Sequence, residues 1–257
     1  MTTDPDIPAL VSSLREVAAA TDRLPDAADS TTRALARRIR TRIQRDLLPR
    51  LGSEAPLLLV AVAGPNNVGK STLFNTLVGS ELSPARAEGG LTQQCLAAAT
   101  PDTASGAGRE ALSARYEVVL LSPGTRAPVT EAGPPGRLFL TSTPALPPGL
   151  VLVDTPDFDS VVRDNRLRSE ALMLTVDVVV FVVSRHTYQN AALVDVVQQA
   201  VGRGRPWVVV YNEAPELETV RAHLDKLTAD VGAAPFARSG VQYAAVAPLV
   251  EAGPGEV

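Results

Sequence analysis

The residues best suited to chemistry lie at 64–71, which read Gly-Pro-Asn-Asn-Val-Gly-Lys-Ser. This spacing, G-x-x-x-x-G-K-S, is typical of a phosphate-binding loop, although a glycine-rich turn without a ligand can share it. Gly64 and Gly69 let the backbone curl so that successive N–H groups point toward an anion. We predict that Lys70 reaches the β- and γ-phosphates of a nucleoside triphosphate and that the Ser71 hydroxyl ligates Mg²⁺. The other expected phosphate contacts come from Asn66, Asn67, Val68 and Thr72.

A Mg²⁺–nucleotide site also needs a carboxylate opposite the loop. Asp154 follows the apolar stretch 149–153, at the carboxyl end of an expected strand, where ligands bind in open α/β sheets. An aspartate that caps a helix or starts a turn is the alternative. Thr92, in a Gly-Gly-Leu-Thr loop, is expected to offer its hydroxyl to Mg²⁺ and its N–H to the γ-phosphate, with Thr100 and Thr103 as weaker competitors.

Asn212, in the stretch Val-Tyr-Asn-Glu-Ala-Pro, is placed to contact the base. A guanine-specific site would also present an aspartate three residues later, and that position is Pro215. Glu213 or Glu216 could compensate, and an ordinary asparagine turn is the alternative.

The elements that must position these residues alternate between strands and helices. We expect strands at 57–63, 149–153, 176–183, 207–211 and 241–246, with helices at 70–79, 162–174, 189–201 and 216–230. Such alternation predicts βαβ units and a three-layer α/β fold around a mostly parallel sheet. Further strands at 94–100, 115–121 and 137–141, separated by Pro/Gly-rich loops at 101–109 and 122–136, suggest an antiparallel edge.

A helical segment is expected before the first core strand, so we divide the chain into residues 1–52 and a phosphate-loop domain, 53–257, with further C-terminal helices expected if the chain is a fragment. The helices are predicted at 7–24 and 31–50, the second capped by Ser30 or Thr31. The second helix carries an apolar row and many arginines. We expect a solvated face with its apolar stripe docked; an anionic-membrane or nucleic-acid surface is the alternative.

Composition excludes several classes of protein. The 257 residues carry a net charge of −4, which gives no general reason to bind DNA or RNA. The single cysteine, Cys95, rules out an internal disulfide. An acidic N-terminus without a signal sequence and the lack of a run of about 20 apolar residues predict a cytoplasmic protein. We expect His186 on a surface loop and His223 solvated in mid-helix.

Together these motifs resemble those of P-loop GTPases of the Era-like and dynamin-like kinds. Residues 64–79 are similar to their first motif, 82–92 to their switch I and 153–161 to their D-x-x-G switch II. The N-terminal helices fit bacterial dynamin-like proteins better than a minimal Era-like domain. The resemblance covers about 57–213 and implies GTP and Mg²⁺ as ligands, the roles given above for Lys70, Ser71, Thr92, Asp154 and Asn212, a homodimer across the nucleotide face and peripheral membrane contact.

Three departures qualify this resemblance. Asp157 stands at the D-x-x-G glycine, where its N–H can still reach the γ-phosphate, and Phe158 stands where some GTPases have a catalytic glutamine. Asn66 or Asn67 is therefore expected to position the attacking water, and Pro215 breaks the base motif. We expect a nucleotide-gated GTPase. A non-hydrolysing scaffold and an NTPase of relaxed base specificity are the alternatives.

Overall fold

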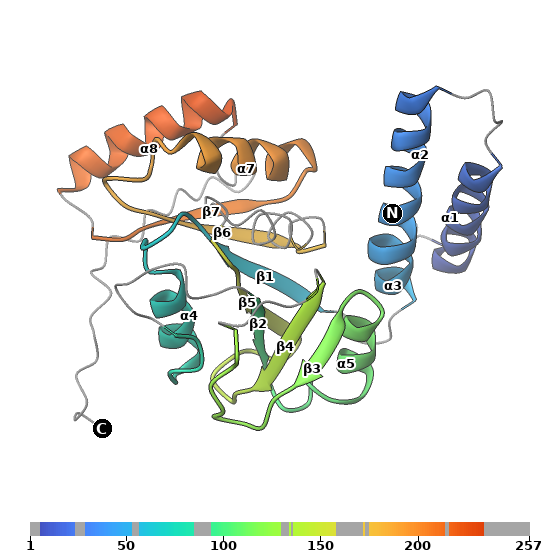
Figure 1. The fold of residues 1–257 in the computed structure, drawn as a ribbon, viewed down its shortest axis with the longest axis horizontal. Coiled ribbons are helices and arrows are strands. Elements are labelled where there is room, and N and C mark those ends of the chain that lie inside the picture. The colour runs from blue at the N-terminus through green and yellow to red at the C-terminus, as the bar shows by residue number, and fades with distance from the viewer. Residues whose placement is uncertain are drawn as a thin grey trace, which may run out of the picture.

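The computed structural model describes residues 6–23, 29–52, 57–84, 94–129, 134, 136–157, 172, 175–213 and 216–233. Its centre is a seven-stranded sheet with the strand order β3-β4-β2-β5-β1-β6-β7 (Figure 1). In chain order the elements are α1 (Ile7–Asp22), α2 (Ser30–Arg42), the π-helical turn η1 (Ile43–Leu47), α3 (Leu48–Leu51), β1 (Leu58–Ala63), α4 (Lys70–Val78), β2 (Cys95–Ala99), α5 (Gly106–Ser113), β3 (Glu117–Leu120), β4 (Arg137–Ser142), β5 (Leu150–Asp154), β6 (Val178–Val183), α7 (Ala191–Gly202), β7 (Trp207–Tyr211) and α8 (Leu217–Val231).

The predicted α/β class is confirmed. β1 lies between β5 and β6 and runs parallel to both, with Val62 opposite Asp154 and Ala63 opposite Phe181. The carboxyl ends of β1, β5, β6 and β7 therefore meet at one edge of the sheet. The helix expected at 162–174, apart from Leu172, and the strand expected at 241–246 lie outside the described residues.

The expected antiparallel edge is mostly wrong. Only β2 and β5 pair antiparallel among the described strands, and β4 pairs parallel with both β2 and β3. The parallel arrangement needs a crossover between β2 and β3, and α5 lies in it, where the glycines suggested a loop. Gly108 allows α5 to pack closely against the Thr103 backbone, since a Cβ on it would lie 2.2 Å from the carbonyl oxygen of Thr103.

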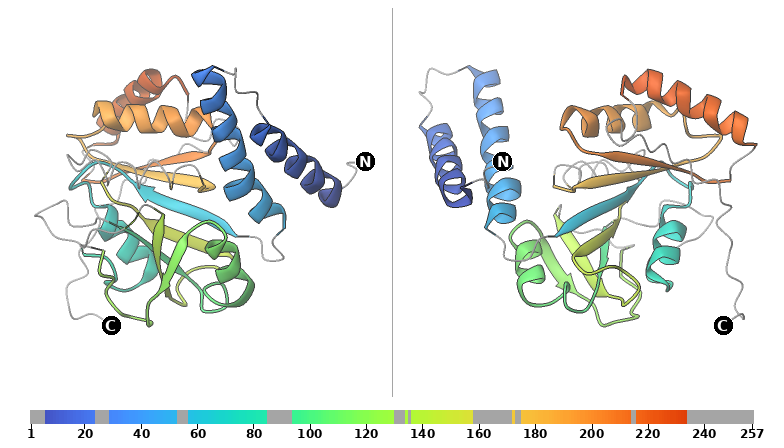
Figure 2. Two further views of the ribbon diagram at one scale, coloured as in Figure 1. Left: turned by 45° about the vertical axis from the view of Figure 1, so that its right-hand side comes forward. Right: turned by 180° about the vertical axis from the view of Figure 1, so that it is seen from behind.

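Alternation along the strands divides the core into two layers. On β1, Leu59, Ala61 and Ala63 join the cluster formed with α5, α7 and α8, whereas Val62 joins Phe74 and Val78 of α4 on the other face. Figure 2 shows α4 on one side of the sheet and α7 and α8 on the other. The sheet is thus buried on both faces, as its apolar strand sequences require.

The N-terminal helices form a hairpin that stands beside the sheet and its helix layers (Figures 1 and 2). The second helix is capped by Asp29, whose side chain accepts from the Thr32 N–H at 2.8 Å, and not by Ser30 or Thr31 as predicted. The apolar row is only partly docked, since Ile43 is buried but Leu35 remains 53% exposed. Within the described residues, no helix combines the length and apolar character needed to cross a membrane.

Candidate functional site

The loop at 64–69 connects β1 to α4 at the carboxyl edge of the sheet. A Cβ on Gly64 would lie 2.5 Å from the carbonyl oxygen of Val182 in β6, so only glycine allows this close approach. Asn67 (φ 57°) and Gly69 (φ 89°) take left-handed conformations that turn the chain into the first residue of α4. The predicted strand–loop–helix context of the phosphate-binding motif is therefore present.

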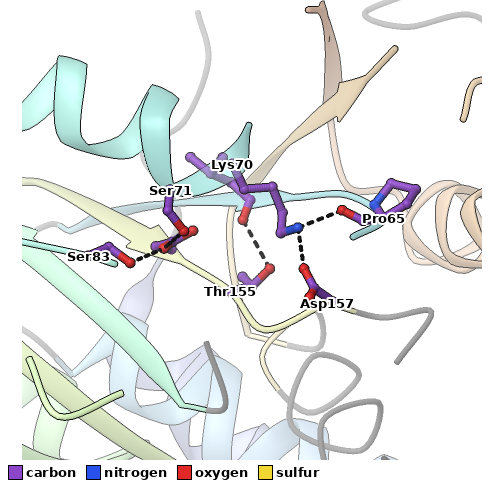
Figure 3. Close-up of polar contacts among 8 residues, drawn as sticks. Pro65, Lys70, Ser71, Ser83, Thr155 and Asp157 are labelled. Atoms are coloured by element: carbon purple, nitrogen blue, oxygen red, sulfur yellow. Dashed lines mark hydrogen bonds and ion pairs between the residues drawn. The ribbon is translucent and has the colours of Figure 1, made fainter. Parts of the chain in front are cut away.

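Lys70 begins α4, and its side chain is almost fully buried. Its ammonium group donates to the carbonyl oxygen of Pro65 at 2.6 Å and to Oδ1 of Asp157 at 2.5 Å (Figure 3). Thr155 fixes the segment between β5 and Asp157 against β1, because its hydroxyl donates to the Val62 carbonyl of β1 at 3.0 Å. The lysine of the loop and the aspartate in the glycine position of D-x-x-G thus form one buried ion pair.

Asp154 is the last residue of β5 and is completely buried. One carboxylate oxygen, Oδ2, accepts from the hydroxyls of Ser71 at 2.8 Å and Ser83 at 2.6 Å (Figure 3). The other oxygen, Oδ1, has no hydrogen-bond partner among the described residues. Burial raises the pKa of the Asp154 carboxyl, and the two hydroxyls and nearby Lys70 only partly oppose this effect.

An unpartnered buried carboxylate oxygen beside a serine hydroxyl is suited to a small divalent cation. Mg²⁺ prefers oxygen ligands and is usually bound by one or two carboxylates together with substrate phosphates. A cation would also offset the burial that raises the pKa of Asp154. The residues present therefore fit the Mg²⁺ that the sequence predicts.

Ser83 lies in the stretch that resembles switch I, but no individual role was predicted for it from the sequence. Asn75 of α4 holds it in place by accepting from the N–H groups of Leu82 and Ser83 and donating to the Ser83 carbonyl at 2.8 Å. Besides the resemblance to switch I, the sequence signal for this contact is the polar amide of Asn75 on the helix that follows the loop. Nothing in the sequence spacing indicates that the Ser83 hydroxyl donates to Asp154, which lies 71 residues later in the chain.

Asn212 follows β7 and faces the phosphate-binding loop. Its side-chain Nδ2 donates to the Val68 carbonyl at 3.0 Å, and its backbone N–H donates to Val183 of β6 at 2.7 Å. The next residue, Glu213, has a positive φ of 51°. Asn212 therefore links the segment after β7 to the phosphate-binding loop through a hydrogen bond, and this role does not depend on a contact with a ligand.

The structure separates the three threonine candidates. Thr100 and Thr103 follow β2, which runs antiparallel to β5, so they lie beside the start of β5 and not beside Asp154. Thr103 accepts there from the Gly149 N–H at 3.0 Å. These two competitors are wrong as Mg²⁺ ligands, while Thr92, Phe158 and Pro215 lie outside the described residues.

The two histidines differ in their surroundings. His186 is exposed on the loop after β6, as expected. His223 is not solvated as predicted: its ring stacks on Tyr188 with centroids 3.8 Å apart, and its Nδ1 lies 2.7 Å from the Tyr211 hydroxyl. The tyrosines make it part of the packing between α8 and the sheet.

Comparison with known proteins identifies the family. The sequence model of the 50S ribosome-binding GTPase family matches residues 59–213, more than half of the 257-residue chain. The chain belongs to this family. The match spans the phosphate-binding loop, Asp154 and Asn212, and it confirms the predicted resemblance to P-loop GTPases. None of the curated proteins matches the sequence significantly.

The chain is also similar to several solved structures. An Aquifex aeolicus Era variant bound to GDP·AlF₄⁻ is 16% identical, with a TM-score of 0.44 over 70% of this chain and 50% of that one. A member of an oligomerised bacterial dynamin pair is 10% identical, with a TM-score of 0.47 over 90% and 44%. A GTP-binding protein from Sulfolobus solfataricus in complex with GDP is 15% identical, with a TM-score of 0.33 over 89% and 58%. The chain thus spans about half the length of these proteins.

Proposed function

We propose that this GTPase-family chain binds GTP with Mg²⁺ and hydrolyses it to GDP and phosphate as a nucleotide-gated switch. The observation that supports this most directly is the buried Asp154 carboxylate, whose Oδ2 accepts from the Ser71 hydroxyl and whose Oδ1 has no hydrogen-bond partner among the described residues. Such a carboxylate would help to hold Mg²⁺, which would supply positive charge next to the phosphates of a nucleotide.

Each residue of the site has a role in this proposal. The backbone of the loop from Gly64 to Gly69 surrounds the phosphates, Lys70 neutralises the β- and γ-oxygens, and Ser71 and Asp154 hold the metal, directly or through its water. Thr72 adds a phosphate contact, Thr92 completes the metal and γ-phosphate contacts, the Asp157 N–H meets the γ-phosphate, and Asn212 lies toward the base. Bound Mg²⁺ would neutralise charge that develops on the phosphate oxygens.

Hydrolysis needs a group that orients the attacking water in line with the leaving oxygen. Asn66 and Asn67 are exposed on the loop, and a side-chain amide can both accept from water and donate to a phosphate oxygen. We assign the water-positioning role to one of these two asparagines. Lys70 then supplies electrostatic stabilisation without exchanging protons.

Two alternatives rest on specific observations. A non-hydrolysing scaffold is favoured by the ion pair that already engages Lys70 with Asp157. A site of relaxed base specificity is favoured by Asn212, whose amide is bonded to the Val68 carbonyl.

The dynamin-like features remain part of the proposal. They comprise dimerisation across the nucleotide face and membrane contact through the N-terminal helices. The boundary proposed at residue 52 is supported by the packing of α1 against α2, which gives the N-terminal segment its own contacts.

The deciding experiment measures binding and turnover of GTP and ATP with and without Mg²⁺. We expect Mg²⁺-dependent GTP turnover that Lys70→Ala abolishes. Because Lys70→Ala also leaves Asp157 buried without its partner, the double variant Lys70→Ala/Asp157→Ala controls for misfolding. Mg²⁺-dependent binding of GTP without turnover at high protein concentration would support the non-hydrolysing scaffold. Equal affinities for GTP and ATP would support relaxed base specificity. Normal nucleotide binding by Lys70→Ala would overturn the assignment of the phosphate-binding site.

A further inference from the structure

A second cavity lies away from the phosphate-binding loop, between α2 and the core of the GTPase domain. Its volume is about 530 Å³, within the range of pockets that hold small molecules. Leu35 and Ile39 of α2 line one wall, and Leu138 and Leu172 of the domain line the other. Neither the motifs nor the proposed GTPase reaction uses this space.

Arginine dominates the polar lining of this cavity. The lining includes Arg37, Arg38 and Arg42 of α2, Arg115 and Arg137 beside β3 and β4, and Arg203 and Arg205 before β7. No aspartate or glutamate is among the described residues that line it. This concentration of positive charge contrasts with the net charge of −4 on the whole chain.

The α2 arginines carry the argument, because some of the others are already engaged. Arg137 pairs with Glu117 at 2.8 Å, and Arg203 donates to the Gln199 carbonyl at 3.3 Å. The side chains of Arg37, Arg38 and Arg42, in contrast, make no hydrogen bond or ion pair within the part of the chain that the structure describes. On the same helix, Arg40 is paired with Asp22 of α1 and does not line the cavity.

We propose that this cavity binds a phosphate-bearing ligand that also has an apolar portion. Guanidinium groups present planar, two-pronged donors that match phosphate oxygens, and they stay charged at any physiological pH. The leucine and isoleucine side chains between them offer an apolar surface that inorganic phosphate cannot use. Such a ligand is either a soluble phosphorylated amphiphile or the headgroup and first chain atoms of an anionic lipid.

Binding here would bridge the N-terminal hairpin and the GTPase domain. The two parts share the lining, and Tyr116 and Thr175 on the domain side hydrogen bond to each other through their hydroxyls. A ligand held by α2 and by this wall would therefore restrict movement of the hairpin relative to the sheet. The consequence is a measurable increase in thermal stability in the presence of the ligand.

The test uses the full 257-residue chain and dodecyl phosphate below its micelle concentration. We expect saturable binding that the double variant Arg38→Gln/Arg42→Gln weakens by about tenfold or more, because it removes two charge-assisted contacts to the phosphate. The matched control, Arg109→Gln/Arg221→Gln, removes the same charge from exposed positions outside the lining and should bind normally. Circular dichroism and thermal unfolding verify that all variants fold.

Two further arms identify the source of the phosphate and separate this site from the nucleotide site. Co-sedimentation with phosphatidylcholine vesicles, with and without phosphatidic acid, tests the lipid source; binding that requires phosphatidic acid and falls in Arg38→Gln/Arg42→Gln supports it. Binding of dodecyl phosphate without vesicle binding supports a soluble ligand. Lys70→Ala should retain dodecyl phosphate binding even if it loses GTP. Absence of binding in both arms, or equal binding by the cavity variant and the wild type, would overturn the proposal.

Discussion

The ammonium group of Lys70 lies 2.5 Å from Oδ1 of Asp157, and both side chains are almost completely buried. The lysine is the cation that a P-loop GTPase directs at the β- and γ-phosphates. In this chain the Asp157 carboxylate binds the same ammonium group. An incoming triphosphate must therefore displace Asp157 from Lys70, and this exchange would connect phosphate binding to the segment that follows β5.

Asp157→Gly should raise the affinity for GTP by about tenfold, a typical size for a coupling of this kind. The same change should lower the stability of the nucleotide-free protein by about 3–5 kcal/mol, because Lys70 is left buried without its partner. Nucleotide titrations and thermal unfolding with and without GTP measure the two effects. Asp195→Asn, an exposed aspartate on α7, is the control and should change neither. Unchanged affinity in Asp157→Gly would contradict competition between the carboxylate and phosphate.

Asp154→Asn should separate metal binding from folding. The amide keeps an oxygen that can accept from Ser71 and Ser83, and it removes the charge whose burial raises the pKa of Asp154. The nucleotide-free variant should therefore be at least as stable as the wild type, while the effect of Mg²⁺ on GTP binding should disappear. Thermal unfolding at neutral pH and GTP titrations with and without Mg²⁺ test this. A large loss of stability would instead indicate that the carboxylate is mainly a structural acceptor.

Gly64→Ala should damage the loop through a steric clash alone. Its new Cβ would meet the Val182 carbonyl at 2.5 Å, whereas a Cβ on Gly202 at the end of α7 would meet nothing within 4 Å. We expect Gly64→Ala to cost about 1–3 kcal/mol of unfolding free energy and to abolish nucleotide binding. Gly202→Ala should be neutral or stabilising by up to about 1 kcal/mol. Chemical denaturation of both variants provides the comparison, and equal behaviour would refute the close-approach argument.

The sequence predicted the elements around the loop well because local signals defined them. Apolar strands such as 57–63 and the glycines at 64 and 69 encode a strand, a turn and a helix within a short span. The parallel β2–β4–β3 edge was not predictable in this way. The parallel direction of these strands depends on the crossover that contains α5. Gly106 and Gly108 of α5 are typical of a loop in the sequence, although Gly108 lies in the helix and packs closely against the Thr103 carbonyl.

The contacts within the site were harder to predict than its residue types. Lys70 and Ser71 were predicted from the G-x-x-x-x-G-K-S spacing and Asp154 from its position at a strand end, and in the structure the Ser71 hydroxyl donates to Asp154. The ion pair of Lys70 with Asp157 spans 87 residues, and no periodicity records it. The contact of Ser83 with Asp154 depends on the Asn75 side chain, which is three-dimensional information that a linear pattern does not contain.

Asn212→Ala should weaken binding of GTP and of inorganic tripolyphosphate alike. Its Nδ2 holds the Val68 carbonyl at 3.0 Å, so the variant loses a support of the phosphate-binding loop as well as any contact with the base. A neutral hydrogen bond of about 0.5–1.5 kcal/mol corresponds to a loss of roughly two- to tenfold in affinity for tripolyphosphate. Titrations with both ligands in the presence of Mg²⁺ measure the two losses. Asn190→Ala removes the asparagine that caps α7 and should lower stability by about 1 kcal/mol without changing either affinity. If Asn212→Ala lowers the affinity for GTP but leaves tripolyphosphate binding intact, Asn212 acts on the base alone and the tie to Val68 has no part in holding the loop.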